Sequence, residues 1–245
     1  MTTIESKLQA VRQRIAAACK VAGRAPSSVQ LLAVSKTFSA ESVREAAAAG
    51  QTQFGENYIQ EAVAKIAALR GLGAEWHCIG PVQGNKTRLV AEHFDWVQSV
   101  DRLKIAQRLN DQRPDNMVPL QVCIQVNTDG GPTKAGVTPE DLPALAYAVA
   151  QLPRLRLRGL MTIPEPAPDF EAACALHRRA SVLLARLQAQ GLALDTLSMG
   201  MSGDLEAAIH AGSTMVRIGT AIFGVRASLP ATPVAVLAAQ AQDNR

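Results

Sequence analysis

A lysine at the end of an apolar segment is the first residue whose type and position could do chemistry. Residues 29–34 are almost entirely aliphatic, and Lys36 follows within two positions. Burial beside an apolar strand disfavours the ammonium form of lysine and lowers its pKa. A neutral amine is the form that reacts with an aldehyde to give a Schiff base. The alternative is that Lys36 only marks the point where a strand reaches water.

Two glycine-containing segments near the end of the chain could hold an anion. Ser202 lies in the first, residues 199–203, and Gly219 and Thr220 begin the second, residues 219–224. Glycine lets the backbone approach an anion closely, and both segments offer hydroxyl donors. Amides at a helix start favour phosphate in particular. The alternative is a helix cap at Ser202 and a plain turn at Gly219.

Charged residues beside these segments modify that expectation. Asp204 and Glu206 follow Ser202 and repel an anion above the next helix, so Gly219 and Thr220 are the stronger candidates. Arg217 lies in an apolar strand segment, where an arginine must be paired or hydrogen-bonded. It either forms a salt bridge to a barrel carboxylate such as Glu56 or donates to a ligand.

Other polar residues give weaker indications. Asn57 follows a short strand, and His77 is the one histidine of four within a predicted strand, so it could face a ligand. Residues 80–87 resemble a phosphate-binding loop, but the glycine spacing is wrong, which argues against ATP binding. Sequence assigns no role to Lys86 in that segment or to Lys134 in a glycine-rich loop.

These residues depend on eight short strands that alternate with helices. An amphipathic helix over about 3–22, opened by capping-box spacing between Thr2 and Glu5, precedes them. The strands are expected near 29–36, 53–57, 76–79, 96–100, 120–126, 155–161, 194–199 and 214–218. Strands separated by helices pair in parallel, and eight such units predict a (β/α)₈ TIM barrel over about 29–224. Lys36, Asn57, Ser202, Arg217, Gly219 and Thr220 then collect at the carboxyl ends of the strands.

Two more helix starts and one alternative fold belong to this prediction. Asp101 should cap a helix with Leu103, Ala106 and Leu109 on its inner face, and Pro139 should occupy the first turn of another. The runner-up is an open doubly wound sheet, but no G-x-G-x-x-G follows the first strand.

Composition excludes several function classes. The 245 residues carry a net charge of +4 and only 4% aromatic residues, which disfavours nucleic-acid binding. The four cysteines are not paired as C-x-x-C and are expected to be small buried hydrophobes in a reducing compartment. No signal peptide or membrane span is evident, so we expect a cytoplasmic protein.

Six motifs in register identify a known family. They are Ala33–Thr37, Phe54–Tyr58, Trp76–Lys86, Arg156–Met161, Leu197–Ser202 and Val216–Gly224. The chain closely resembles the pyridoxal 5′-phosphate (PLP) homeostasis family (YggS/PROSC type) over nearly its whole length. Gly84, where the family often has serine, and a single acidic residue at Asp204 are small departures, and the tail aromatic usual after Gly224 is missing.

The resemblance implies a barrel like the N-terminal domain of alanine racemase, of PLP fold-type III. It also implies that Lys36 forms the Schiff base with PLP, that Asn57 lines the cofactor, and that Arg217 faces the pyridine nitrogen. Ser202, Gly219 and Thr220 would hold the phosphate, and His77 is retained as a cofactor-site candidate. Arginine cannot accept a proton, so the ring would remain a weak electron sink.

We therefore expect a non-enzymatic PLP carrier or buffer. Residues 1–245 are expected to form a single domain whose tail, about 227–245, is too short for the second domain that racemases use. The alternative is a PLP-dependent amino-acid racemase with Lys36 as one base, and a barrel for another phosphorylated metabolite is a third option. PLP-dependent apo-enzymes are possible partners, no nucleic acid or metal is expected, and a monomer is favoured.

Overall fold

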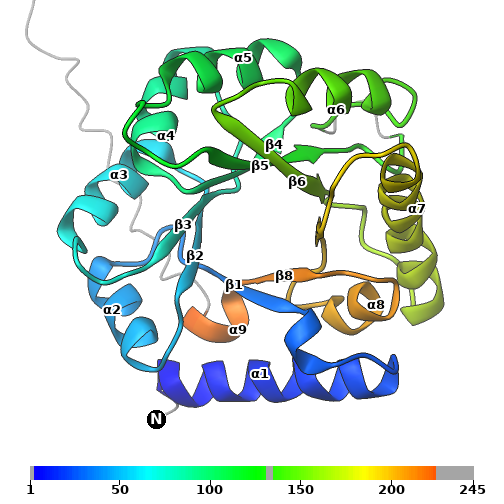
Figure 1. The fold of residues 1–245 in the computed structure, drawn as a ribbon. Helices are drawn as coiled ribbons and strands as arrows, with labels where there is room; N and C mark the ends of the chain where they lie inside the picture. Colours follow the sequence, from blue (N-terminus) through cyan, green and yellow to red (C-terminus); the bar gives the residue numbers. More distant parts are fainter. Residues whose placement is uncertain (1–2, 131–134, 225–245) are drawn as a thin grey trace, which may run out of the picture.

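Eight parallel strands close into a barrel in the computed structural model, which describes residues 3–130 and 135–224 (Figure 1). The strands are β1 Gln30–Val34, β2 Gln53–Glu56, β3 Glu75–Cys78, β4 Trp96–Val100, β5 Leu120–Gln125, β6 Leu155–Met161, β7 Thr196–Ser198 and β8 Met215–Ile218. They pair in sequence order, and β8 closes on β1 through the register Ala33 with Ile218. The predicted TIM barrel is confirmed.

A helix follows every strand on the outside of the barrel. These helices are α2 Ala40–Ala48, α3 Ile59–Ala68, α4 Thr87–His93, α5 Leu103–Gln112, α6 Leu142–Ala150, α7 Phe170–Ala189, α8 Leu205–His210 and α9 Thr220–Phe223. Their apolar sides, with the outward faces of the strands, form the main core. This alternation places every carboxyl strand end at one mouth of the barrel.

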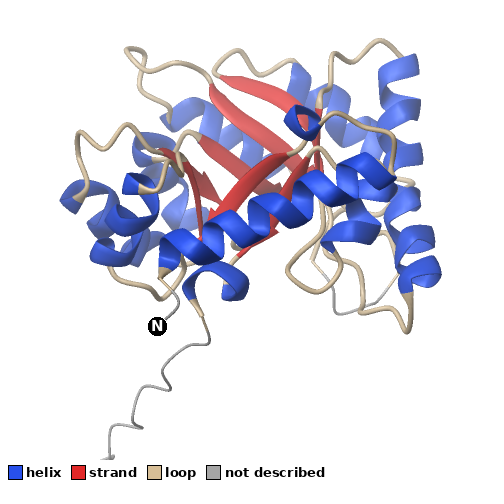
Figure 2. Ribbon diagram, turned by 90° about the horizontal axis from the view of Figure 1, so that it is seen from below, coloured by secondary structure: helices blue, strands red, loops and turns tan. Residues whose placement is uncertain are grey.

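An additional helix, α1 Ile4–Val21, completes the outer ring. It runs across the outside of the barrel (Figure 2) and packs against α2, α8 and α9, with α9 lying between the other two (Figure 1). Its buried stripe of Leu8, Val11 and Ile15 has the spacing that predicted the helix. The short α9 cannot fill this space, so α1 lies where the helix after β8 would otherwise be.

Three details of the predicted helix ends are wrong. Thr3 caps α1 by accepting a hydrogen bond from the Ser6 N–H, so the predicted pairing of Thr2 with Glu5 is displaced by one residue. Helix α5 begins after Arg102 without a side-chain cap from Asp101. Leu103 on that helix is 37% exposed, and Ile105 takes the predicted inward place.

The start of α6 also differs from the prediction. The helix begins at Leu142 and not at Pro139, because Thr138 accepts a hydrogen bond from the Asp141 N–H in a preceding turn. Lys134 and the tail from 227 to 245 lie outside the described residues.

The four cysteines are reduced and buried, as the sequence predicted. Burial raises the pKa of Cys78 and of Cys123 to about 12, so both stay thiols at neutral pH. Within residues 3–130 and 135–224, no helix is long and apolar enough to cross a membrane. The same part of the chain contains no cluster of three or more His, Cys, Asp or Glu side chains suited to a metal ion.

Candidate functional site

Lys36 lies in a tight turn where β1 ends at the carboxyl mouth of the barrel. The Ser35 N–H donates to the Gly55 carbonyl of β2 at 3.0 Å, and the Phe38 N–H donates back to the Ser35 carbonyl at 3.1 Å. Thr37 has a φ of 68°, a left-handed conformation that is unfavourable for a β-branched residue. The turn is therefore held in an uncommon conformation at the lysine.

A buried ion cluster on the outer side of β2 holds this turn. Lys65 of α3 donates from Nζ to the Ser35 carbonyl at 2.9 Å and to Glu56 Oε1 at 2.6 Å. Glu56 Oε1 also accepts from the Ser35 hydroxyl at 2.6 Å. Glu61 accepts from the Thr37 N–H at 2.8 Å and from Lys65 at 3.2 Å. The residues before and after Lys36 are thus both tied to Lys65 and its two carboxylates.

Burial dominates the electrostatics of this cluster. The side chains of Lys65 and Glu56 are 4% and 0% exposed. Burial raises the pKa of Glu56, although Lys65 and the Ser35 hydroxyl oppose the shift. Glu56 Oε2 has no hydrogen-bond partner among the described residues. The carboxylate therefore depends on Lys65 to remain ionised.

The proposed anion-binding segments follow β7 and β8, which are neighbours of β1. Gly200 has a φ of 92°, and a Cβ there would lie 2.5 Å from Ala208 Cβ, so only glycine fits this turn. Its carbonyl accepts from the Arg217 N–H at 3.0 Å, which ties the β7 segment to β8. A Cβ on Gly219 would lie 3.1 Å from the Val34 carbonyl oxygen. The second segment therefore lies directly against the end of β1, two residues before Lys36.

The acidic residues that counted against an anion here are both bonded to other parts of the protein. Glu206 forms a two-pronged salt bridge with Arg14 of α1, with N–O distances of 2.9 and 3.0 Å. The same guanidinium donates to the Ser202 carbonyl at 3.2 Å. Asp204 accepts from the Met201 N–H at 2.6 Å and from His177 Nε2 at 2.9 Å. Both carboxylates thereby support the segment that carries Ser202.

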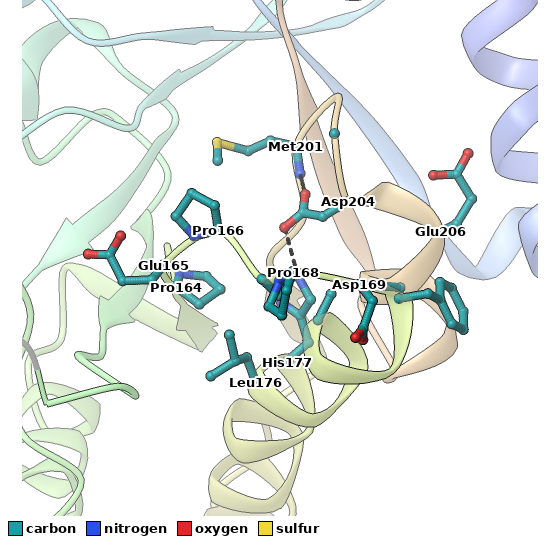
Figure 3. A pocket seen from close by; sticks show the side chains of 15 residues that line it. Pro164, Glu165, Pro166, Pro168, Asp169, Leu176, His177, Met201, Asp204 and Glu206 are labelled. Atoms are coloured by element: carbon teal, nitrogen blue, oxygen red, sulfur yellow. Dashed lines mark hydrogen bonds and ion pairs between the residues drawn. The ribbon is translucent and has the colours of Figure 1, made fainter.

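Asp204 and His177 lie at the edge of a cavity of about 460 Å³ beside this segment (Figure 3). Burial alone would raise the pKa of Asp204, but the hydrogen bonds from His177 and from the Met201 amide outweigh it and lower the pKa. The cavity wall continues through Pro164, Pro166 and Pro168 of the β6–α7 connection. The β7–α8 turn is thus held from the α7 side as well as from α1.

Arg217 points into the barrel and is only 5% exposed. It donates to the Ser198 hydroxyl at 2.8 Å and to the Thr162 carbonyl at 2.9 Å. Burial lowers its pKa to about 10, so it remains charged at neutral pH. The alternative of a salt bridge to Glu56 is wrong, because Glu56 lies on the outer face of β2 and pairs with Lys65.

Asn57 and His77 occupy different depths on the β2–β3 side. Asn57 follows β2, and its buried Oδ1 has no hydrogen-bond partner among the described residues. A Cβ on Gly80 would lie 2.3 Å from the Asn57 carbonyl oxygen, so glycine is needed beside it. His77 is 0% exposed, and both its ring nitrogens bond to protein, to Glu75 at 2.8 Å and to Gln98 at 2.9 Å. It therefore lies beneath the surface of the mouth.

The barrel brings most of the predicted residues to one mouth. Lys36, Asn57, Ser202, Gly219 and Thr220 follow strands β1, β2, β7 and β8, which adjoin around the barrel in the order β7, β8, β1, β2. The sequence reasoning missed the residues that support them: Arg14, Lys65, Gln98, Thr162, His177 and Ser198. Two of these, Gln98 and Ser198, could have been found from the sequence, because each is a polar residue within an otherwise apolar strand.

Comparison with known proteins agrees with this architecture. The family model described as the alanine racemase N-terminal domain matches residues 6–227. A pyridoxal phosphate homeostasis protein of Pseudomonas aeruginosa is 60% identical over 226 residues, covering 92% of this chain and 97% of that protein. The Escherichia coli protein of the same description is 55% identical over 229 residues, covering 92% of this chain and 98% of its own.

Solved structures give the same family relationship. PipY of Synechococcus elongatus, determined with PLP bound, is 40% identical and has a TM-score of 0.80, covering 91% of this chain and all of PipY. An alanine racemase of Clostridium difficile has a TM-score of 0.67 at 16% identity over 82% of this chain and 53% of its own, which is a likeness of fold alone. The chain belongs to the family of the alanine racemase N-terminal domain and, within it, to the pyridoxal phosphate homeostasis proteins.

Proposed function

We propose that this protein binds PLP through a Schiff base with Lys36 and acts in PLP homeostasis as a carrier or buffer without substantial turnover. One observation carries the proposal: Lys36, the Ser202 segment and the Gly219–Thr220 segment lie on three adjoining strand ends, with Arg217 directly below. PLP has an aldehyde, a phosphate and a ring nitrogen. This arrangement offers each of them a partner of matching chemistry.

The donors at the mouth fit such a cofactor. Ser202 and Thr220 supply hydroxyls, and the first N–H groups of α9 have no carbonyl partner within that helix. The orphaned Oδ1 of Asn57 lies in a buried position where a polar ligand atom would satisfy it. Of the acids nearest the phosphate segment, Glu206 is paired with the guanidinium of Arg14, and Asp204 is hydrogen-bonded to His177 and the Met201 amide. The residues present are therefore compatible with PLP.

The same residues favour storage over catalysis. Bound PLP can stabilise a carbanion when its ring nitrogen carries a proton. Arg217 is a donor with a pKa of about 10 that stays charged at neutral pH, so it would present N–H groups to the ring nitrogen of bound PLP. Arg217 would keep that nitrogen unprotonated, and we expect slow reaction with amino acids.

An amino-acid racemase is the second candidate, because Lys36 could serve as one base. Racemisation needs a second acid–base group on the opposite face of the substrate. Tyr58 is 52% exposed at the start of α3, and the Tyr147 hydroxyl donates to the Gln190 carbonyl at 2.9 Å on the outside of the barrel. Tyr147 is not placed for that role, and Tyr58, although it adjoins Asn57 at the mouth, is exposed to solvent, which favours the carrier over a closed racemase site.

The deciding experiment is the absorbance spectrum of the protein mixed with PLP, wild type against Lys36→Ala. We expect a visible Schiff-base band in the wild type only, and borohydride reduction should fix the cofactor to the peptide that contains Lys36, as read by mass spectrometry. Absence of the band in wild type with excess PLP would refute the proposal and favour another phosphorylated ligand. Loss of optical activity of amino acids at above about 1 s⁻¹ would favour the racemase.

Several further properties belong to the same proposal. We infer that the chain acts as a single barrel domain and a monomer in the cytoplasm, and that PLP-dependent apo-enzymes receive the cofactor. Sedimentation of the loaded protein tests the oligomeric state. Mixing the loaded protein with an apo-enzyme and a PLP-trapping amine distinguishes direct transfer from release into solution.

A further inference from the structure

A chain of hydrogen bonds between side chains crosses the interior of the barrel. It starts at Arg217, whose Nη1 donates to the Ser198 hydroxyl at 2.8 Å. The hydroxyl donates to Gln98 Oε1 at 2.7 Å, and Gln98 Nε2 lies 2.9 Å from His77 Nδ1. His77 Nε2 lies 2.8 Å from Glu75 Oε1. The chain thus links strands β8, β7, β4 and β3.

The two ends of this chain fix its direction. Arginine can only donate, so the Ser198 hydroxyl accepts from Arg217 and passes its own proton to Gln98 Oε1. The Gln98 amide therefore presents its NH₂ to His77 Nδ1, which must be unprotonated. The His77 proton is then on Nε2, where it faces the carboxylate of Glu75, which can only accept. Every donor points from Arg217 toward Glu75.

The chain also connects the two ends of the barrel. Glu75 is the first residue of β3 and its side chain is 38% exposed at the amino-terminal end, whereas Arg217 lies below the carboxyl mouth. The three side chains between them, His77, Gln98 and Ser198, are each 0% exposed. Water therefore has no access to the intermediate links, and the dipoles act in a medium of low dielectric constant.

Arg217 is held by neutral acceptors, and the carboxylate that acts on its charge is Asp204, not Glu75. No carboxylate among the described residues forms a salt bridge with its guanidinium, and the two groups that accept from it, Ser198 and the Thr162 carbonyl, are neutral. A buried cation of this kind is costly unless its donors are satisfied. The chain that ends on Glu75 satisfies one of them and fixes which way the Ser198 hydroxyl points. The orientation of the guanidinium is thereby fixed from below.

We propose that Glu75, His77, Gln98 and Ser198 are positioning residues that hold Arg217 in place for the ring nitrogen of the bound cofactor. The inference rests on the proposed function, since it needs PLP at the mouth. It also changes the predicted role of His77 from direct cofactor contact to support of Arg217. The position of His77, fully buried and bonded at both nitrogens, agrees with this role.

The state of His77 is central to the chain. A second proton on the ring would place an N–H of Nδ1 against the NH₂ of Gln98 and break the link. The charged groups around the His77 ring are Glu75, Asp95 and Arg158. Arg158 lies on the indole of Trp96, 4.9 Å from its ring centroid, and this indole stacks on His77. Burial lowers the pKa of His77 despite the opposing effect of Glu75 and Asp95. The ring therefore stays neutral at physiological pH.

The first test uses the protein without cofactor. Nitrogen-15 NMR of wild type should show His77 as a neutral ring protonated at Nε2 from about pH 6 to about pH 8. A charged ring, or a ring protonated at Nδ1, would overturn the direction of the chain. This measurement does not depend on PLP binding.

The second test cuts the chain at two depths. Ser198→Ala removes the link next to Arg217, and His77→Phe keeps the stacking on Trp96 but removes both distant hydrogen bonds. Ser181→Ala is the matched control, because its hydroxyl donates to the Ala211 carbonyl at the α7–α8 contact, away from the chain. Glu75→Gln keeps an acceptor for His77 and should preserve most of the function.

The expected results separate positioning from mere structural support. Ser198→Ala should weaken PLP binding about ten- to a hundredfold, as for loss of one buried hydrogen bond to a charged group. Ser198→Ala and His77→Phe should both shift the pH midpoint of the visible Schiff-base absorbance band, whereas Ser181→Ala should not. If both chain variants fold and match the control, the inference is wrong while the proposed function stands. If wild type itself does not bind PLP, both fail together.

Discussion

Replacing Lys65 by methionine isolates the buried cluster that supports the Lys36 turn. Methionine is close to lysine in length and is apolar, so the packing of α3 on β2 changes little. The change removes the three contacts of Nζ, with the Ser35 carbonyl at 2.9 Å, Glu56 at 2.6 Å and Glu61 at 3.2 Å. It leaves the Glu56 carboxylate, whose side chain is 0% exposed, with only the Ser35 hydroxyl as a partner.

The expected loss of stability follows from that isolated charge. Removing one partner of a buried ion pair costs about 3–5 kcal/mol, because the other charge is left without compensation. Lys65→Met should therefore lower the free energy of unfolding by about this amount at pH 8, measured by urea denaturation. Adding Glu56→Gln removes the isolated charge, so the double variant should be more stable than Lys65→Met alone.

The free energy of unfolding of Lys65→Met should depend on pH, and the pKa of Glu56 sets the sign of that dependence. Burial already raises the pKa of Glu56 in the folded protein, and loss of Lys65 raises it further, because Lys65 opposes the shift. Between the unfolded and folded pKa values the native state holds the extra proton, so stability falls as pH rises. The loss of unfolding free energy in Lys65→Met, relative to wild type, should thus shrink as the pH is lowered toward the ordinary glutamate range. It should grow as the pH is raised.

The same variant should weaken the cofactor site, since the turn loses the contact at the Ser35 carbonyl. We expect lower PLP affinity for Lys65→Met in a spectroscopic titration. Lys104→Met is the matched control, because Lys104 is exposed on α5 and outside the cluster. The reasoning is refuted if Lys65→Met unfolds at the same urea concentration as this control, or if the Glu56→Gln addition fails to restore any stability.

Three other changes test further parts of the site. Thr37→Asn should stabilise the fold by up to about 1 kcal/mol in urea denaturation, because asparagine tolerates the left-handed conformation better; no gain would show that the turn carries no strain. Gly219→Ala should reduce PLP affinity several-fold in titration, since its Cβ would lie 3.1 Å from the Val34 carbonyl oxygen and move the phosphate segment. The Asp204 pKa is lowered in the folded state, so its stabilising effect is present above the unfolded value and lost as pH falls. Asp204→Asn should flatten the acid limb of thermal stability between about pH 5 and about pH 2, and an unchanged limb would contradict this.

The order of elements was predictable because each strand and helix has a strong local signal. Period-four apolar positions in α1 and the apolar runs of β1, β4 and β6 are local properties, and the structure reproduces them within one or two residues. Helix starts were less predictable, as Leu103 and Pro139 show. A cap is decided by which of several nearby groups makes the hydrogen bond, and spacing alone does not fix that choice.

The site was predictable to the extent that it lies at strand ends. Lys36, Ser202 and Gly219 follow strands directly, so the barrel rule alone brings them to one mouth. The support beneath them was not predictable, because Lys65 comes from a helix and Arg14 from another helix 192 residues away from its partner Glu206. Such pairings depend on three-dimensional register, which no periodicity in the sequence records.

The position of α1 also determines how early in synthesis the barrel can finish folding. The apolar stripe of α1 packs on α8 and α9, near the other end of the barrel sequence. At ordinary ribosomal rates, the 192 residues between Arg14 and Glu206 take roughly 10–40 s to synthesise. During that time the apolar stripe of Leu8, Val11 and Ile15 lacks the surface that α8 and α9 supply. The first helix to emerge is therefore among the last to be fully packed.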